Sequence, residues 1–104
     1  MLRFCIHYGI HFILPVLIAY RFYRPRFLRV SLILLSGILI DLDHLPAIPV
    51  FDPDRCSIGF HLLHSYPAIV LYILLFLWKP TRIAGLALLI HILADVTDCL
   101  MMNL

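Results

Sequence analysis

Imidazole and carboxylate side chains occur in this sequence as closely spaced pairs. The members of each pair are three or four positions apart, so they share one face of a helix. The four pairs are His7 and His11, Asp41 and His44, His61 and His64, and His91 and Asp95. Asp98, seven positions after His91, continues the stripe that the last pair begins. Neutral imidazole and carboxylate together are the ligand set that proteins use for zinc, iron and manganese.

The eight paired residues therefore predict a site for a divalent metal. Six histidines and several aspartates exceed the three or four protein ligands that one zinc ion requires, which favours two ions roughly 3.5–4 Å apart. One ion, with aspartates that orient its histidine ligands, is the alternative. We expect zinc first, with iron and manganese as the other choices. Taken alone, a histidine such as His11 is more often a hydrogen-bonding residue at a helix contact than a ligand.

Three further residues are candidates for catalysis. The chain contains no Glu, so a general base must be an Asp or a His that is not bound to metal. Asp43 and Asp98 are the candidates for this role. Arg55 could clamp a phosphate group, because guanidinium binds phosphate oxygens in a bidentate manner. Asp52 and Asp54 are more readily explained as solvated loop residues.

The elements that must position these residues are four apolar runs, each about as long as a helix that crosses a bilayer. They cover residues 2–20, 28–45, 60–78 and 83–102, with a longer link at 46–59 that contains three prolines. Hydrophobic residues make up 63% of the chain and charged residues only 13%. This composition excludes a soluble monomer and a disordered chain. The net charge of +2 also gives no indication of nucleic-acid binding.

The fold that we expect is all-α: an integral-membrane four-helix up-down bundle that forms a single transmembrane domain of residues 1–104. The run at 2–20 has no cleavage site of the A-x-A type, so we expect it to be retained. Proline within the first and third runs, Pro15 and Pro67, should free the carbonyl four residues earlier and kink each helix. A homodimer is possible, since four such helices bury little surface.

Basic residues gather at the two short links and predict which side faces the cytoplasm. Six of the eight lie there: Arg21, Arg24, Arg26, Arg29, Lys79 and Arg82. Short basic loops stay on the cytoplasmic side, so both termini and the link 46–59 should lie on the non-cytoplasmic side of a bacterial inner membrane. Every His and every Asp then falls near that outer end. Because all four paired stripes lie at one level, they can meet inside the bundle.

Cysteines occur at positions 5, 56 and 99, all near the same end. An odd number cannot pair completely, although a non-cytoplasmic location permits disulfides. Cys56–Cys99 and Cys5–Cys99 are both possible pairings. Burial of these cysteines as small hydrophobic residues is a third possibility.

Five motifs together resemble those of small multi-pass bacterial membrane proteins related to the membrane-bound metal-dependent hydrolases, which include the LexA-binding inner-membrane hydrolase. The motifs are His7-Tyr-Gly-Ile-His11, Asp41-Leu-Asp43-His44-Leu, Phe51-Asp-Pro-Asp-Arg-Cys-Ser57, Phe60-His-Leu-Leu-His-Ser65 and His91-x-x-x-Asp95-x-x-Asp98-Cys99. The resemblance implies metal ligands among the four pairs and Asp43. This chain is shorter than the larger hydrolases of that group.

The function that we expect is metal-dependent hydrolysis at the outer end of the bundle, on a lipid or phosphoester substrate. A divalent metal lowers the pKa of water and polarises a phosphoryl or carbonyl oxygen. Two alternatives stay open. One is a protein similar to the membrane di-iron oxygenases, because H-x-x-x-H and H-x-x-H spacings also resemble desaturase histidine motifs. The other is a non-enzymatic membrane protein that binds metal or haem.

Overall fold

The computed structural model describes residues 2–44, 46, 56, 58–59 and 61–102, with Leu42, Asp43 and His44 described by their backbone alone. These residues form four α-helices and no strand. The helices are α1 (Leu2–Phe22), α2 (Phe27–Leu35), α3 (Tyr66–Leu77) and α4 (Arg82–Met101). Short 3₁₀ segments flank them: η1 (Arg24–Arg26), η2 (Ser36–His44), η3 (Leu62–His64) and η4 (Lys79–Thr81). The all-α prediction is thereby confirmed.

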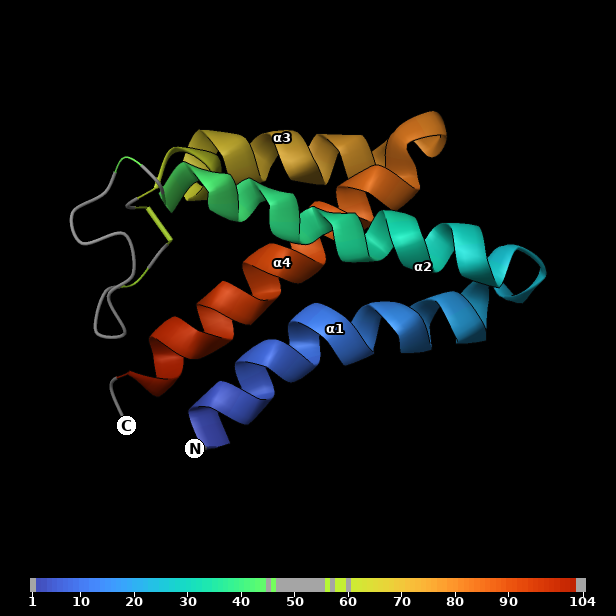
Figure 1. Ribbon diagram of the computed structural model, residues 1–104. Coiled ribbons are helices and arrows are strands. Elements are labelled where there is room, and N and C mark those ends of the chain that lie inside the picture. Colours follow the sequence, from blue (N-terminus) through green and yellow to red (C-terminus); the bar gives the residue numbers. More distant parts are fainter. Residues whose placement is uncertain (1, 45, 47–55, 57, 60, 103–104) are drawn as a thin grey trace.

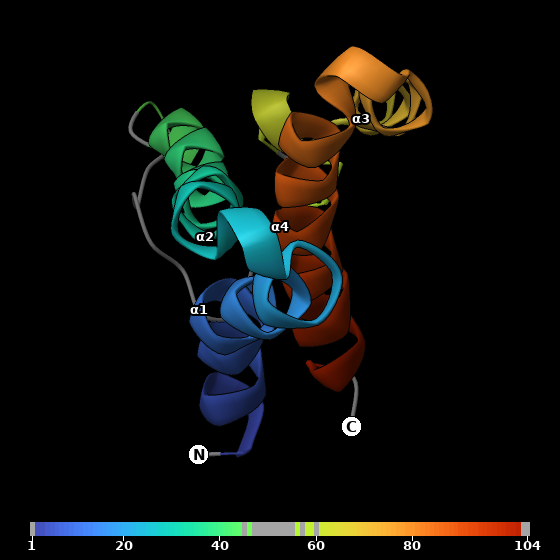
Figure 2. The same ribbon diagram turned by 90° about the vertical axis from the view of Figure 1, so that its right-hand side faces the viewer.

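Helix α4 is the central element of the bundle. It packs against α1, α2 and α3, and Figure 2 shows it running between α3 on one side and α1 with α2 on the other. Its buried residues include Ala87, Ile90, His91, Ile92 and Asp95, which face different directions around the helix. A helix that is covered on most of its faces can bring its polar residues into contact with several neighbours at once.

The second predicted helix, 28–45, is not α-helical throughout. The α-helical part ends at Leu35, and the hydroxyl of Ser36 donates to the carbonyl of Ile33 at 2.6 Å. The chain then continues as the nine-residue η2, a long run for a 3₁₀-helix. Gly37 explains how η2 lies so close to α4: a Cβ at this position would be 2.5 Å from the carbonyl oxygen of Ala87. Only a glycine allows this approach, which brings Asp41 to α4.

The third helix begins later than position 60, where the sequence predicts it. Helix α3 starts at Tyr66, with the hydroxyl of Ser65 accepting from the N–H of Ala68 at 3.4 Å. Pro67 thus lies in the first turn, where its missing N–H costs nothing, and the prediction of a kink there was wrong. The carbonyl of Leu63 accepts instead from the hydroxyl of the buried Tyr72, at 2.7 Å.

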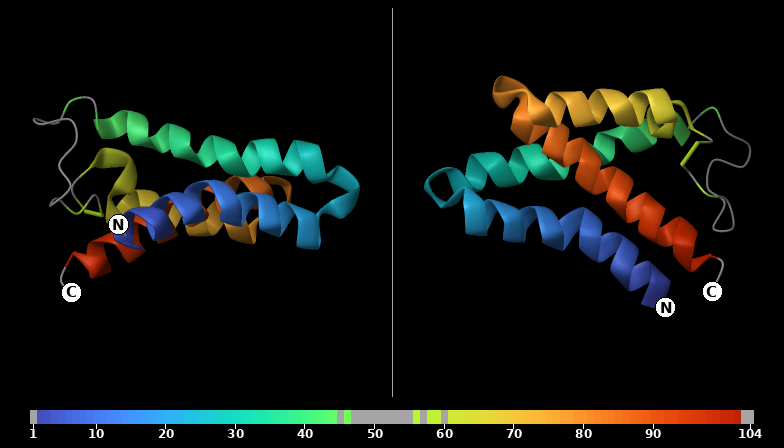
Figure 3. Two further views of the ribbon diagram at one scale, coloured as in Figure 1. Left: turned by 60° about the horizontal axis from the view of Figure 1, so that its bottom comes forward. Right: turned by 180° about the vertical axis from the view of Figure 1, so that it is seen from behind.

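The structure has two distinct ends. Figures 1 and 3 show both termini at one end and both short turns, around η1 and η4, at the other. Near the turns, the apolar core contains Ala19, Val30, Leu34, Ala87 and Ile90. His91 and Asp95 follow along α4 toward the terminal end. The expected common level of the histidines and aspartates is therefore seen for those whose side chains are described.

Two stretches are long and apolar enough to cross a membrane, by length and composition alone: Leu2–Phe22 and Lys79–Met101. Helix α3 has 12 residues and is shorter than this. Large hydrophobic side chains are exposed on the outside of the bundle, with exposed fractions of 57% at Leu17, 61% at Leu32 and 57% at Leu74.

Candidate metal centre

Four potential ligands from three elements converge beside α4. His91 and Asp95 are one turn apart on α4, Asp41 comes from η2 and His64 from η3. One ligand atom of each lies within 4.8 Å of the others. We refer to these residues as the four-ligand group. The turn that carries His64 is fixed by backbone hydrogen bonds from Gly59 N to His64 O (3.0 Å) and from His64 N to His61 O (3.1 Å).

The ligand atoms of this group are close enough to share one cation. Nε2 of His64 lies 2.7 Å from Oδ2 of Asp95 and 3.1 Å from Nε2 of His91. Nε2 of His91 lies 2.9 Å from Oδ1 of Asp41 and 3.2 Å from Oδ2 of Asp95. Four ligands around a tetrahedral zinc ion are about 3.3 Å from one another, for bonds of ~2.0 Å. The donor set and its spacing fit such an ion.

Hydrogen bonding alone does not account for this arrangement. Nε2 of His64 lies within 3.4 Å of three atoms, from Asp41, His91 and Asp95. An imidazole nitrogen has one hydrogen at most, so it can donate well to only one of them. His64 is fully buried, and His91 and Asp95 are 2% and 6% exposed. Burying a carboxylate here is costly, and a divalent cation would offset that cost.

A second group shares Asp95 with the first. Nε2 of His11 lies 3.1 Å from Nε2 of His7, and Nε2 of His7 lies 3.9 Å from Oδ1 of Asp95. These three residues form the three-ligand group. The two oxygens of Asp95 therefore face different groups, Oδ1 toward His7 and Oδ2 toward His64 and His91. This is the arrangement in which one carboxylate can bridge two metal ions.

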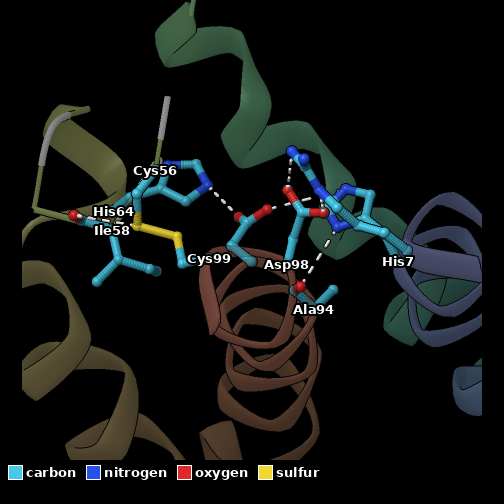
Figure 4. The surroundings of a disulfide bond; sticks show 9 residues. His7, Cys56, Ile58, His64, Ala94, Asp98 and Cys99 are labelled. Carbon is cyan, nitrogen blue, oxygen red and sulfur yellow. Dashed lines mark hydrogen bonds and ion pairs between the residues drawn. A yellow bond between two sulfur atoms is a disulfide. The ribbon is translucent and has the colours of Figure 1, made fainter. Parts of the chain in front are cut away.

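The rings of this cluster are oriented by contacts outside the ligand atoms. Nδ1 of His7 lies 3.3 Å from the carbonyl of Ala94, which can only accept, so Nδ1 carries the hydrogen. In the neutral ring, Nε2 then presents its lone pair, as metal-binding histidines commonly do. The ring of His11 packs on that of His91, with centroids 4.5 Å apart. Figure 4 shows His7 beside Ala94 and His64 on the other side of α4, near the disulfide.

An ion pair and a disulfide lie beyond the ligands, at the terminal end. Arg3 donates to the two oxygens of Asp98 through Nε at 2.6 Å and Nη2 at 3.3 Å. This pair joins the start of α1 to the end of α4. Cys56 and Cys99 form a disulfide, one of the two expected pairings, and Cys5 is a free, exposed cysteine. The partnership of Arg3 with Asp98 was not predicted, although both residues lie at the same end of neighbouring helices.

The other predicted site residues are placed as follows. His61 is buried, with its ring centroid 5.8 Å from that of His64, and it belongs to neither ligand group of the described residues. Asp98 also lies outside both groups. The backbone of Asp43 and His44 lies in η2, but their side chains, and all of Arg55, lie outside the part of the chain that the structure describes.

Fold and site together define an all-helical bundle with a buried cluster of histidines and aspartates near the end that carries the termini. The chain belongs to DUF6122, a family of unknown function, whose signature matches residues 1–102. No curated protein matches the chain, and no solved structure matches it.

Proposed function

We propose that this protein is a membrane-embedded, metal-dependent hydrolase. The observation that carries the proposal is the convergence of Asp41, His64, His91 and Asp95 on one buried point. In this proposal the four-ligand group holds one divalent ion, and His7 and His11 hold a second ion that shares Asp95. Zinc is the first choice for a set of two nitrogen and two oxygen ligands, with iron and manganese as alternatives.

Partial access to the ligands supports a catalytic role over a purely structural one. The side chain of Asp41 is 34% exposed and that of His7 is 18% exposed, whereas the other members of the two groups are more deeply buried. A structural metal site is usually closed, and a catalytic one keeps a position that water or substrate can reach. In this proposal water or substrate reaches the two groups past the partly exposed side chains of Asp41 and His7.

The chemistry that a divalent metal supplies is to acidify water and to polarise a phosphoryl or carbonyl oxygen. The chain must supply a base that is not a ligand. Arg3 occupies both oxygens of Asp98, which leaves Asp43 as the first candidate. Arg55 is the candidate that clamps a phosphate. The resemblance to membrane-bound metal-dependent hydrolases supports this assignment, with a lipid or phosphoester as substrate.

Location in a bacterial inner membrane is part of the same proposal. Helix α1 has 21 residues, which is about 32 Å and matches the hydrocarbon core of a bilayer. Exposed leucines and phenylalanines on several helices would be costly in water but favourable in lipid. The basic residues at the two turns support a cytoplasmic location for that end, with the metal centre on the opposite side.

Elemental analysis of the purified protein tests the metal centre. We expect wild type to carry one or two ions of zinc, iron or manganese per chain, and His64→Ala to lose the ion of the four-ligand group. His61→Ala is the matched control: it removes a buried imidazole from the same turn, but one outside both groups, and should keep its metal. Equal metal content in wild type and His64→Ala would remove the basis of the proposal.

Hydrolysis is then tested with metal-loaded protein on phosphoester and acyl-ester lipids. Turnover by wild type that is lost in His64→Ala supports the hydrolase. Metal binding without any turnover would support a non-enzymatic metal-binding protein instead.

The shared Asp95 favours one further candidate, a protein similar to the di-iron oxygenases. A carboxylate between two histidine-rich groups is also suitable for two iron ions. Iron content of two per chain, with oxygen consumption in the presence of a reductant, would support this candidate over the hydrolase. Zinc as the native metal would exclude it.

A further inference from the structure

The end of the bundle opposite the metal centre contains a hollow of about 520 Å³ between the two short turns. Its walls come from η1 and the start of α2 on one side, and from η4 and the start of α4 on the other. Figures 1 and 3 show these turns at the same end of the molecule. Four of the lining side chains are cationic: Arg26, Arg29, Lys79 and Arg82. We call this hollow the basic pocket.

The basic pocket has no acidic residue in its lining. The sequence contains no Asp or Glu from position 4 to 40 or from 55 to 94, which covers every element that forms the pocket. All six acidic residues belong to the other end of the molecule or to the link 46–59. Four positive charges thus face one hollow without a counter-ion from their own elements. Their repulsion would be relieved by an anion.

The basic side chains at this end fall into two sets. Arg21 lies over the ring of Phe22 and Arg24 over that of Tyr20, at 5.4 and 4.5 Å from the ring centroids, and neither lines the pocket. Arg82 donates through Nε to the carbonyl of Phe76 at 3.1 Å, which fixes its guanidinium at the pocket wall.

The other members of the pocket retain their hydrogen-bond donors. Within the described ranges, the side chains of Arg26, Arg29 and Lys79 make no hydrogen bond or ion pair with another protein group, and neither does the hydroxyl of Tyr23. Guanidinium and ammonium groups carry only donors. The side chains that line the pocket therefore offer hydrogen-bond donors and positive charges. An oxyanion supplies the matching acceptors.

We propose that the basic pocket binds a phosphate-bearing anion. Guanidinium groups bind phosphate oxygens in a bidentate manner, and lysine adds a point charge. A volume of about 520 Å³ is in the usual range for a small-molecule site and can hold one phosphodiester group or a diphosphate. The headgroup of an anionic lipid and a free polyphosphate share this chemistry. The proposal is independent of the metal centre, which lies at the opposite end.

The test compares two variants that each lose two positive charges from this end of the full-length protein. Arg29→Gln/Lys79→Gln removes charges from the pocket, and Arg21→Gln/Arg24→Gln removes them beside it. Native mass spectrometry in neutral detergent measures retention of cardiolipin against phosphatidylcholine. We expect the pocket variant to bind cardiolipin about thirtyfold more weakly than wild type, and the control variant to lose much less. Equal losses in both variants would overturn the proposal, as would no loss in either variant together with no pyrophosphate binding that depends on the pocket.

Calorimetry with inorganic pyrophosphate, in the absence of lipid, distinguishes the two sources of phosphate. Saturable binding of pyrophosphate that the pocket variant loses, without any preference for cardiolipin, supports a soluble ligand. Preference for cardiolipin that depends on the pocket supports a lipid headgroup. Arg29→Lys/Lys79→Arg keeps both charges and should retain binding in either case. Failure of this charge-conserving variant to bind, while it remains folded by circular dichroism, would contradict a charge-based site.

Discussion

At the scale of single residues, the sequence predicted that histidines and aspartates would cluster but not which members of each pair would meet. His91 and Asp95 are together because an α-helix fixes positions i and i+4 on one face. His61 and His64 were expected to share a face in the same way, but His64 ends the short η3 before α3 while His61 precedes η3 in extended backbone, and only His64 joins the four-ligand group. Local spacing cannot reveal where a helix starts when an N-cap such as Ser65 competes with the apolar pattern.

Asp98 illustrates a second limit at this scale. It continues the stripe of His91 and Asp95, which made it a candidate base, but its partner Arg3 is distant in sequence. An ion pair between the first and last helices depends on tertiary packing, so the spacing of residues within one helix does not predict it.

The pairing leads to a prediction for two matched variants. Arg3→Gln and Asp98→Asn should each destabilise the protein slightly, by ~0.2–1 kcal/mol, because the pair is partly exposed. Metal content should stay unchanged in both, since neither residue belongs to a ligand group. Thermal unfolding and elemental analysis measure these effects. If Asp98→Asn abolishes hydrolysis while Arg3→Gln stays active, Asp98 is the general base and its pairing with Arg3 is incidental.

At the scale of elements, the close contact of η2 with α4 determines whether the four-ligand group can form. The sequence predicted a continuous helix at 28–45, since the apolar run has no proline to interrupt it. A 3₁₀-helix rises about 2.0 Å per residue against 1.5 Å in an α-helix, so η2 carries Asp41 farther along α4 than an α-helix would. The helix changes type at Ser36, where η2 begins, and Gly37 then packs against Ala87 of α4. This contact depends on the neighbouring helix, so the local sequence does not predict it.

Gly37→Ala tests this contact. The added methyl would collide with the carbonyl of Ala87, so we expect a loss of stability of ~1–3 kcal/mol and a lower metal content as Asp41 moves away. Gly9→Ala is the control, since a Cβ there meets nothing within 4 Å and should leave the protein as stable or more stable. Unfolding midpoints and elemental analysis report both effects. If Gly37→Ala is destabilised but keeps its full metal content, the contact of η2 with α4 stabilises the protein without positioning Asp41, and the second half of the prediction is wrong.

The disulfide links the segment before η3 to the C-terminal part of α4, at the end of the molecule that carries the termini. Cys56 and Cys99 are separated by 43 positions, and the loop-entropy estimate for a link of this length is about 4 kcal/mol. We therefore expect Cys56→Ser, or treatment of wild type with a reductant, to lower the unfolding midpoint in detergent substantially. Cys5→Ser should have no such effect, because Cys5 is free and exposed. Equal midpoints for all of these proteins would mean that the disulfide is not formed in solution.

At the scale of the whole molecule, the chain separates its charges between two ends. The basic pocket lies between the turns, and the described histidine and aspartate side chains lie nearer the termini, with the apolar core between them. The sequence predicted this separation because it depends only on the order of the charged residues relative to the four apolar runs. The existence of the pocket did not follow from the sequence, since it depends on how closely the two turns approach each other.

Charge separation of this kind predicts the orientation of the protein in a membrane. Basic turns should remain in the cytoplasm, and the end with the termini should be outside. Single cysteines test this in a Cys5→Ser background, where the native Cys56–Cys99 disulfide leaves no other thiol. A membrane-impermeant maleimide should label Leu2→Cys in intact spheroplasts, and Arg24→Cys only after permeabilisation. The reverse pattern would place the metal centre on the cytoplasmic side, where the histidine motifs of desaturases lie, and would favour the oxygenase candidate.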